Sequence, residues 1–316
     1  MSGTASDATG FPVHPERTSR VAEGSLLLIT VLWGTTFPLL RLTLERISPY
    51  DVIALRFTIA GVVLALIYGR RIARAGRIAI WDGLRTGLFM AAGYLTQAIG
   101  LTTTSTPRSA FLTAMAVVFV PFISFVVLRT GILAGEAAGV GLAFLGLVFF
   151  YSDAGFGIRP GDLWTLAGAA AFGAQIVTTN VAARRSDPFV VSAVQAVVAA
   201  AVGWLFVGAQ GGLSVPAHAV PWGTILYLSI VATAFILVLQ TWALGKTKPV
   251  RAGVIYSLEP VFAAVFAMAF FAEGMSAREV LGSAAILAGV VVAELKKARW
   301  PGEDAADTRR TGGSAR

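Results

Sequence analysis

Repeated apolar runs of about 20 residues constrain this chain more than any other feature. A bilayer core of roughly 30 Å requires about 20 consecutive apolar residues of each helix that crosses it. Runs of this kind, broken by charge, proline or glycine, lie near 24–44, 51–69, 83–101, 108–128, 134–151, 162–182, 188–209, 221–245, 250–271 and 278–294. The pattern predicts an all-α integral membrane protein with ten transmembrane helices.

Composition supports a membrane environment and removes several classes of chemistry. Hydrophobic residues make up 56% of the chain and charged residues 13%, against roughly 45–50% and about 25% in soluble domains. The absence of cysteine excludes disulfides, thiolate nucleophiles and cysteine metal sites. The two histidines, His14 and His218, fall in a tail and a loop, so we expect no metal or other cofactor.

The basic residues are distributed unevenly between the loops. If the ten runs span a membrane, 19 lysines and arginines lie on one side and five on the other, and Arg56 lies within the second run. The positive-inside rule then predicts cytoplasmic N- and C-termini in a multi-pass inner or plasma membrane protein. The net charge of +8 indicates anionic membrane lipids as partners rather than nucleic acid, because these residues flank apolar runs.

The two ends of the chain are polar. Residues 1–23 precede the first run without the features of a signal peptide, so we expect a cytoplasmic tail and a retained first helix. Residues 299–316, rich in Gly, Asp, Arg and Thr, predict a disordered cytoplasmic tail.

The two halves of the chain, 24–152 and 162–295, share an internal repeat. The pairs Gly34/Gly173, Pro49/Pro188 and Pro121/Pro260 are 139 residues apart, and the pairs Gln97/Gln240, Glu136/Glu279, Gly139/Gly282 and Gly146/Gly289 are 143 apart. Because five spans per half is an odd number, the second half must enter the membrane from the opposite side. The repeat therefore predicts inverted topology, an architecture from which many secondary transporters build a central site.

Several short motifs occur in order on this ten-helix frame. They are Trp33-Gly34, Ser48-Pro49 followed by Arg56, the stretches 97–101 and 109–113, Phe119-Val120-Pro121-Phe122, and the stretch 257–262. With them the chain resembles the EamA family of the drug/metabolite transporter superfamily. The resemblance implies an exporter or permease for amino acids and similar metabolites. It also implies a central cavity bounded mainly by the first, third, fourth, sixth, eighth and ninth spans.

Polar and aromatic residues recur at helical spacing within those spans, so several share one helix face. We expect these candidates to line a solute cavity: Trp33, Phe37, Tyr94, Gln97, Thr113, Gln175, Gln240, Tyr256 and Glu259. The alternative interpretation is that the hydroxyls and amides merely join neighbouring helices, with each bond contributing about 0.6–2 kcal/mol.

Glu259 and Arg56 are ionisable residues placed well inside predicted spans. A charge deep in a bilayer costs at least about 2.5–3.5 kcal/mol, so such residues are functional candidates. Glu259 could carry a proton or contact a solute, pair structurally with Arg56, or meet water near a helix end. Pro38, Pro121 and Pro260 could kink their helices into hinges or cavity-facing acceptors, although proline is also ordinary in membrane helices.

The function that these patterns favour is secondary transport, by alternating access, of small metabolites, most readily the export of amino acids or related amphipathic solutes. The alternative is a non-transport membrane protein such as an intramembrane enzyme, a channel or a receptor. No paired nucleophile and base is evident in the spans. Gly245-Lys246-Thr247 lacks the earlier glycine of a phosphate-binding loop, because that position holds Gln240.

Overall fold

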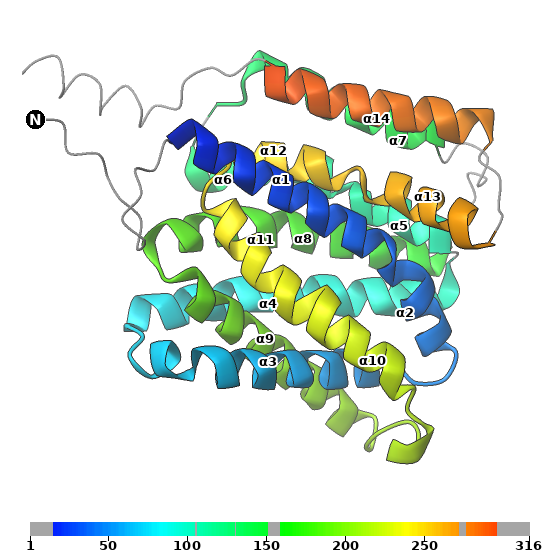
Figure 1. Cartoon of the computed structure of the whole chain (residues 1–316). Coiled ribbons are helices and arrows are strands. Elements are labelled where there is room, and N and C mark those ends of the chain that lie inside the picture. The colour runs from blue at the N-terminus through cyan, green and yellow to red at the C-terminus, as the bar shows by residue number, and fades with distance from the viewer. Residues whose placement is uncertain (1–14, 105, 130, 151–158, 272–275, 296–316) are drawn as a thin grey trace, which may run out of the picture.

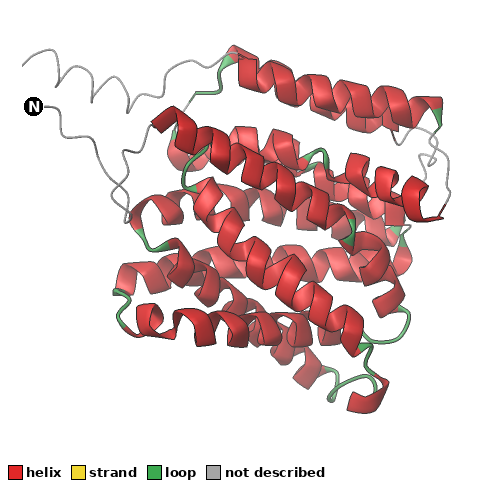
Figure 2. Ribbon diagram, viewed as in Figure 1, coloured by secondary structure: helices red, strands yellow, loops and turns green. Residues whose placement is uncertain are grey.

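The computed structural model describes residues 15–104, 106–129, 131–150, 159–271 and 276–295. These residues are helical apart from short turns and loops, and no strand occurs within the described ranges (Figure 2). The predicted C-terminal tail 299–316 and the first 14 residues of the predicted N-terminal tail lie outside them.

Helices follow one another through short connections in both halves of the chain. The first half contains α1 (Pro15–Gly34), α2 (Thr36–Leu44), α3 (Pro49–Ala73), α4 (Arg77–Thr103), α5 (Thr106–Ala114), α6 (Ala116–Leu128) and α7 (Ala134–Phe150). The second contains α8 (Pro160–Arg185), α9 (Pro188–Ala209), the 3-10 turn η2 (Ala217–Ala219), α10 (Trp222–Ser229), the π-helix η3 (Ile230–Phe235), α11 (Ile236–Leu244), α12 (Pro249–Tyr256), α13 (Glu259–Phe271) and α14 (Ala277–Leu295).

Many of these helices are suited to a membrane. Among the described residues, seven helical stretches are long and apolar enough to cross one: Arg20–Leu44, Pro49–Ala73, Arg108–Leu128, Pro160–Arg185, Pro188–Ala209, Trp222–Leu244 and Pro249–Phe266. Two shorter apolar stretches lie in α7 and α14, and the 27-residue α4 carries charged residues in its first turns. The chain is a multi-pass membrane protein.

The first helix begins earlier than the sequence predicts. α1 starts at Pro15, nine residues before the expected boundary at 24, so the second part of the predicted polar tail is helical. Within this extension the carboxylate of Glu23 lies 3.5 Å from the guanidinium of Arg251. A polar residue that pairs with a distant segment can continue a helix that its hydropathy alone would end.

Equivalent starts of α3 and α9 repeat the same capping chemistry. Pro49 and Pro188 each stand in the first turn, where the missing N–H costs nothing. Ser48 accepts a hydrogen bond from the backbone N–H of Asp51, and Asp187 accepts one from Phe189. These two caps define where both helices begin.

Three spans are interrupted near the prolines that the sequence singled out. A proline ring clashes with the carbonyl four residues earlier. Pro38 lies four residues after Gly34, where α1 ends, and Pro260 lies four after Tyr256, where α12 ends. α5 and α6 meet at Met115, six residues before Pro121.

Close helix contacts depend on glycine. α4 packs along α8, α3 along α9, and α7 along α14, while α1 lies against α11 and α13 (Figure 1). A Cβ added at Gly139 would lie 2.7 Å from the carbonyl oxygen of Gly289, and one at Gly146 would lie 2.7 Å from that of Gly282. Such approaches are typical of small residues at membrane helix interfaces.

The start of α1 and the end of α14 lie at the same end of the bundle, on the left in Figure 1. The α3–α4 turn, the α8–α9 turn and the α11–α12 turn lie at that end too (Figure 1). We call it the terminal end.

Candidate functional site

A cavity lies where the interrupted helices meet. Its walls come from α1, α2, α3, α4, α5, α6, α8, α11, α12 and α13. The lining residues are Trp33, Thr36, Phe37, Leu40, Arg56, Tyr94, Gln97, Thr113, Ala114, Ala116, Phe172, Gln175, Ile176, Gln240, Gly253, Tyr256 and Glu259. About 60 Å³ is open to the centres of water-sized spheres, which is room for roughly four to six waters.

The interruptions between consecutive helices lie at this cavity. Trp33 and Thr36 flank the interruption between α1 and α2, and Ala114 and Ala116 flank the one between α5 and α6. Irregular backbone at membrane depth is tolerated where it lines a cavity or is buried in protein. The helix interruptions and the cavity-lining side chains therefore indicate the same site.

Aromatic rings form much of the cavity wall. The centroids of Trp33 and Tyr256 are 5.0 Å apart. Tyr94 stands edge-on between Phe57 and Phe172, with centroid distances of 5.1 Å to each. Rings at these separations pack favourably, so the wall is a packed aromatic surface with polar tips.

Arg56 brings a buried cation to the cavity. Arg56 is 2% exposed. Its Nε donates to Thr233 Oγ1 at 2.6 Å, and its Nη2 donates to the carbonyl of Ala232 at 3.1 Å. The guanidinium carbon lies 4.7 Å from the Tyr94 ring centroid. Neutral oxygens and a ring face hold this cation, with no carboxylate partner among the described residues.

The π-helix η3 supplies both acceptors of Arg56. Thr233 donates its own hydroxyl to the carbonyl of Leu228, five residues earlier, at 2.7 Å. The carbonyl of Ala232, in the same π-helix, accepts the second hydrogen bond from Arg56. No pattern in the sequence indicates a π-helix at this segment.

Glu259 is the first residue of α13 and lines the same cavity at 9% exposure. No ion pair joins it to Arg56, and within the described residues no hydrogen bond or ion pair of its carboxyl is found. The alternative in which Glu259 serves as the structural partner of Arg56 is therefore not the arrangement in this structure. The physical reason is that η3 already holds the guanidinium.

Two further polar groups lack partners. Trp33 Nε1 and the Tyr256 hydroxyl are buried without a hydrogen bond, although Tyr256 lies near the amide of Gln240. A buried donor without a partner costs about 1–3 kcal/mol. Both residues line the cavity, so a solute could satisfy them.

The amides of the cavity also connect helices. Gln97 Nε2 donates to Thr113 Oγ1 at 3.0 Å, joining α4 to α5, and Gln175 Nε2 donates to Gln195 Oε1 at 3.1 Å, joining α8 to α9. Both interpretations of these residues thus apply together, because each amide lines the cavity and bridges two helices.

All nine side chains that the sequence marks as solute contacts lie around this one cavity. Sequence reasoning missed Thr36, Leu40, Ala114, Ala116, Phe172, Ile176 and Gly253. Thr36 and Leu40 follow Trp33 by three and seven residues, so the face rule that selected Trp33 could have found them.

Between the cavity and the terminal end lies a buried cluster of four charges. Glu136 Oε1 is 3.0 Å from Lys248 Nζ and 3.9 Å from Arg251 Nε, and Arg251 also pairs with Glu23. Along α12 these basic residues precede the cavity residues Gly253 and Tyr256. The cluster joins α1, α7 and the start of α12.

Comparisons with known proteins agree along nearly the whole chain. The model of the EamA-like transporter family matches residues 22–152 and 159–294. A relative from Archaeoglobus fulgidus described as an uncharacterized transporter is 30% identical over 284 residues, covering 87% of this chain and 86% of its own. A second uncharacterized transporter of that organism is 25% identical over 290 residues, covering 86% of this chain and 98% of its own. One solved crystal structure has a similar fold, with a TM-score of 0.72, 20% identity, and coverage of 87% of this chain and 96% of that one.

Proposed function

Because this chain belongs to the EamA-like transporter family and is a membrane transporter, we propose that it carries small amphipathic solutes, amino acids or related metabolites, by alternating access at the central cavity. The observation that carries this proposal is a pair of ionisable side chains with no ionic partner among the described residues. Arg56 and Glu259 line one cavity without pairing with each other. A solute with both a carboxylate and an ammonium group would satisfy both.

The solute contacts follow from this arrangement. The guanidinium of Arg56 donates hydrogen bonds to the carboxylate of the solute, and the carboxyl of Glu259 accepts from its ammonium group. The aromatic wall of Trp33, Tyr94 and Tyr256 packs against its apolar part. Once the solute has left, Glu259 can take up a proton in place of the ammonium group, which offers a route to proton coupling.

We further propose ten spans arranged as two inverted repeats. In support, the repeat shift of 143 exchanges Gly139 with Gly282 and Gly289 with Gly146. The close contact between Gly139 and Gly289 is thereby converted into the one between Gly282 and Gly146. A two-fold relation between α7 and α14 accounts for both contacts at once.

The small cavity and the buried cluster support an alternating-access cycle. The cavity has an open volume of about 60 Å³, and we propose that the helices part to let a solute reach it. The cluster of Glu23, Glu136, Lys248 and Arg251 closes the terminal end. We assign that end to the cytoplasm of a cell-membrane protein, from the 19 to 5 distribution of basic residues, and we propose export as the direction.

Solute counterflow in proteoliposomes tests the proposal. Liposomes holding the purified protein are loaded with one unlabelled amino acid or metabolite at a time, and uptake of the labelled solute is measured. We expect saturable exchange that zwitterionic solutes support and their amides or decarboxylated analogues do not. Flux that rises linearly with concentration, without exchange, would instead indicate a channel.

Introduced cysteines test the orientation, because the chain has none of its own. We expect Ser2→Cys and Ser314→Cys variants to resist an impermeant maleimide in intact cells and to react after the cells are opened. Labelling of either residue from outside would reverse the assigned topology.

A further inference from the structure

A basic pocket lies at the terminal end, apart from the central cavity. Its open volume is about 470 Å³, and its wall contains Arg70, Arg71 and Arg74 of α3 and its C-cap, Ile78 of α4, and Arg185 of α8. Four guanidinium groups around one open pocket create a site for an anion that carries more than one oxygen acceptor.

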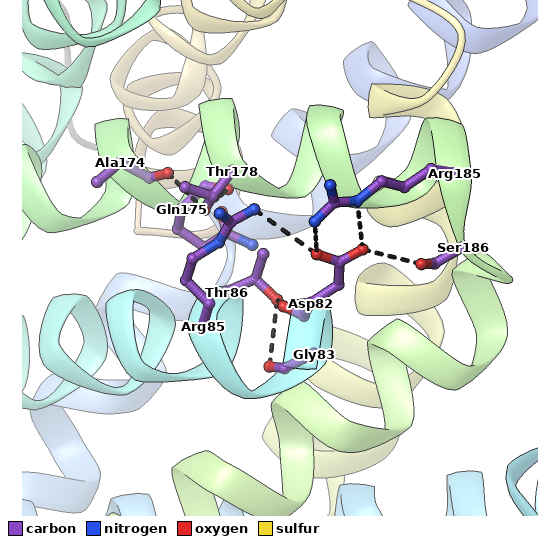
Figure 3. A network of polar contacts seen from close by, with 9 residues as sticks. All are labelled: Asp82, Gly83, Arg85, Thr86, Ala174, Gln175, Thr178, Arg185 and Ser186. Carbon is purple, nitrogen blue, oxygen red and sulfur yellow. Dashed lines mark hydrogen bonds and ion pairs between the residues drawn. The ribbon is translucent and has the colours of Figure 1, made fainter. Parts of the chain in front are cut away.

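Only two of these arginines have carboxylate partners in the part of the chain that the structure describes. Arg71 pairs with Asp187 at 3.3 Å. Arg185 donates through Nε to Asp82 at 2.9 Å, and Ser186 donates to the same carboxylate at 2.8 Å (Figure 3). Hydrogen bonds from Arg185 hold the pKa of Asp82, which precedes the span predicted from residue 83, below its usual value.

Arg70 and Arg74 are exposed and have no such partner in the described residues. The pocket therefore keeps an excess of positive charge after its internal pairs are counted. Asp82 pairs with Arg185 and also lies 3.7 Å from Arg85, so among the pocket arginines Arg70 and Arg74 are the two without a carboxylate partner in the described residues.

An apolar groove lies next to this pocket along α3 and the start of α9. It has an open volume of about 570 Å³ and is lined by Val63, Ile67 and Tyr68 of α3, by Ile230 and Phe235 of η3, and by Val238 of α11, among others. Along α3 the groove residues directly precede the pocket arginines. The surface changes from apolar to basic within about one helical turn.

Aromatic contacts connect the groove with the pocket. The Tyr68 and Phe189 rings, both of the groove, have centroids 4.7 Å apart. The guanidinium carbon of Arg71, in the pocket wall, lies 4.6 Å from the Phe189 centroid. On the neighbouring α4, Trp81 is 67% exposed, as expected of a tryptophan at the headgroup level of a membrane.

We propose that the pocket and groove together bind one anionic phospholipid, with its phosphate on Arg70 and Arg74 and an acyl chain along the groove. The charge of the pocket selects the headgroup, and the groove selects a lipid over a free anion. The occupied groove lies against η3, the segment whose Thr233 and Ala232 hold Arg56. The lipid thus packs behind the turn that positions the cavity cation.

Thermal unfolding of the purified full-length protein in a neutral detergent tests the proposal. Dioleoyl phosphatidylglycerol should raise the melting temperature by several degrees, because a ligand that binds only the folded state stabilises it. Phosphatidylcholine with the same chains, and inorganic phosphate, should give at most half of that shift. Phosphatidylglycerol with six-carbon chains should also fall short of the dioleoyl lipid, because it cannot fill the groove.

The Arg70→Gln/Arg74→Gln double variant should reduce the phosphatidylglycerol shift to the phosphatidylcholine level. A matched control, Arg129→Gln/Lys246→Gln, removes two exposed basic residues outside the pocket and should keep the shift. Because all four side chains are exposed, the variants should fold, which their melting temperatures without lipid verify. Equal stabilisation by inorganic phosphate, equal stabilisation by the short-chain lipid, or equal loss in the control pair would each overturn the assignment of a phospholipid site.

Discussion

The charges of this protein fall into two regions that differ in how they are satisfied. In the buried cluster toward the terminal end, Glu136 and Arg251 meet opposite charges at 3.0–3.9 Å. In the central cavity, Arg56 meets only neutral oxygens and a ring, and Glu259 meets neither Arg56 nor another described charge.

This difference separates structural charges from charges available to a solute. A buried ion pair is weak evidence for net stability, but removing one partner is costly because the other is left uncompensated. When a buried charge that has no counterion is replaced by a neutral side chain, no opposite charge loses its partner. Substitutions in the cluster should therefore affect folding, and substitutions in the cavity should affect transport.

The largest expected effect is on stability, from Arg251→Gln. The change leaves Glu23 and Glu136 without one of their cationic partners. We expect the free energy of unfolding to fall by about 3 kcal/mol, at the low end of the range for broken buried pairs because Glu136 keeps Lys248. Denaturation followed by tryptophan fluorescence in detergent measures it. Adding Glu23→Gln should restore part of the loss, because it removes the carboxylate that paired with Arg251 and leaves the Glu136–Lys248 pair in place. A single variant as stable as the wild type would refute the structural role of the cluster.

The corresponding change in the cavity, Arg56→Gln, should act on transport instead. A hydrogen bond to a charged group contributes about 1.5–3 kcal/mol, so we expect the apparent affinity for a carboxylate-bearing solute to fall roughly 10- to 100-fold. Unfolding should change by no more than about 1 kcal/mol, because no carboxylate is stranded. Counterflow kinetics and melting curves on the same preparation separate the two readouts.

Arg56→Lys is the matched control, because it keeps the charge and loses the planar fork of donors. We expect it to recover part of the affinity. A stable Arg56→Gln protein with unaltered saturation kinetics would remove Arg56 from the solute site.

A smaller change in affinity is expected from Glu259→Gln, with a distinct effect on coupling. Gln cannot exchange a proton, so uptake driven by a pH gradient should disappear while solute exchange continues, weakened by about tenfold or less. Stability should stay close to that of the wild type, since Glu259 has no charged partner to strand. A stable variant that keeps full pH-driven transport would exclude Glu259 from coupling.

The sequence predicts the bounds of several helices and many residues of the cavity wall, because both depend on local periodicity. Runs of apolar residues place α9 at 188–209 and α14 within one residue of 278–294. The face rule, together with the family resemblance, collects side chains such as Tyr94 and Gln97 that the structure places at one cavity.

The partners of the charges could not be predicted in the same way. Arg56 meets Thr233 across 177 residues of chain, and its second acceptor is the Ala232 carbonyl of the π-helix η3. Glu23, in the early part of α1, likewise meets Arg251 far along the chain. Such contacts follow from packing between halves of the molecule, which helical periodicity does not encode.

Gln97→Ala should give the smallest effect and probes both roles of the cavity amides. The substitution removes a solute-facing amide and leaves the Thr113 hydroxyl without the hydrogen bond that joins α4 to α5. Interhelical bonds of this kind contribute about 0.6–2 kcal/mol, so we expect stability to fall by no more than that. Loss of one neutral hydrogen bond to the solute, worth about 0.5–1.5 kcal/mol, should weaken apparent affinity in counterflow about two- to tenfold. Thr96→Ala is a matched control on the same helix, since Thr96 bonds its own backbone at Ala92 and does not line the cavity. Transport by the control should match the wild type.

If Gln97→Ala, Tyr94→Ala and Trp33→Ala all kept wild-type saturation kinetics, the solute path would have to lie elsewhere in the bundle. The difference between the paired charges of the cluster and the unpaired groups of the cavity would then say nothing about where the solute binds.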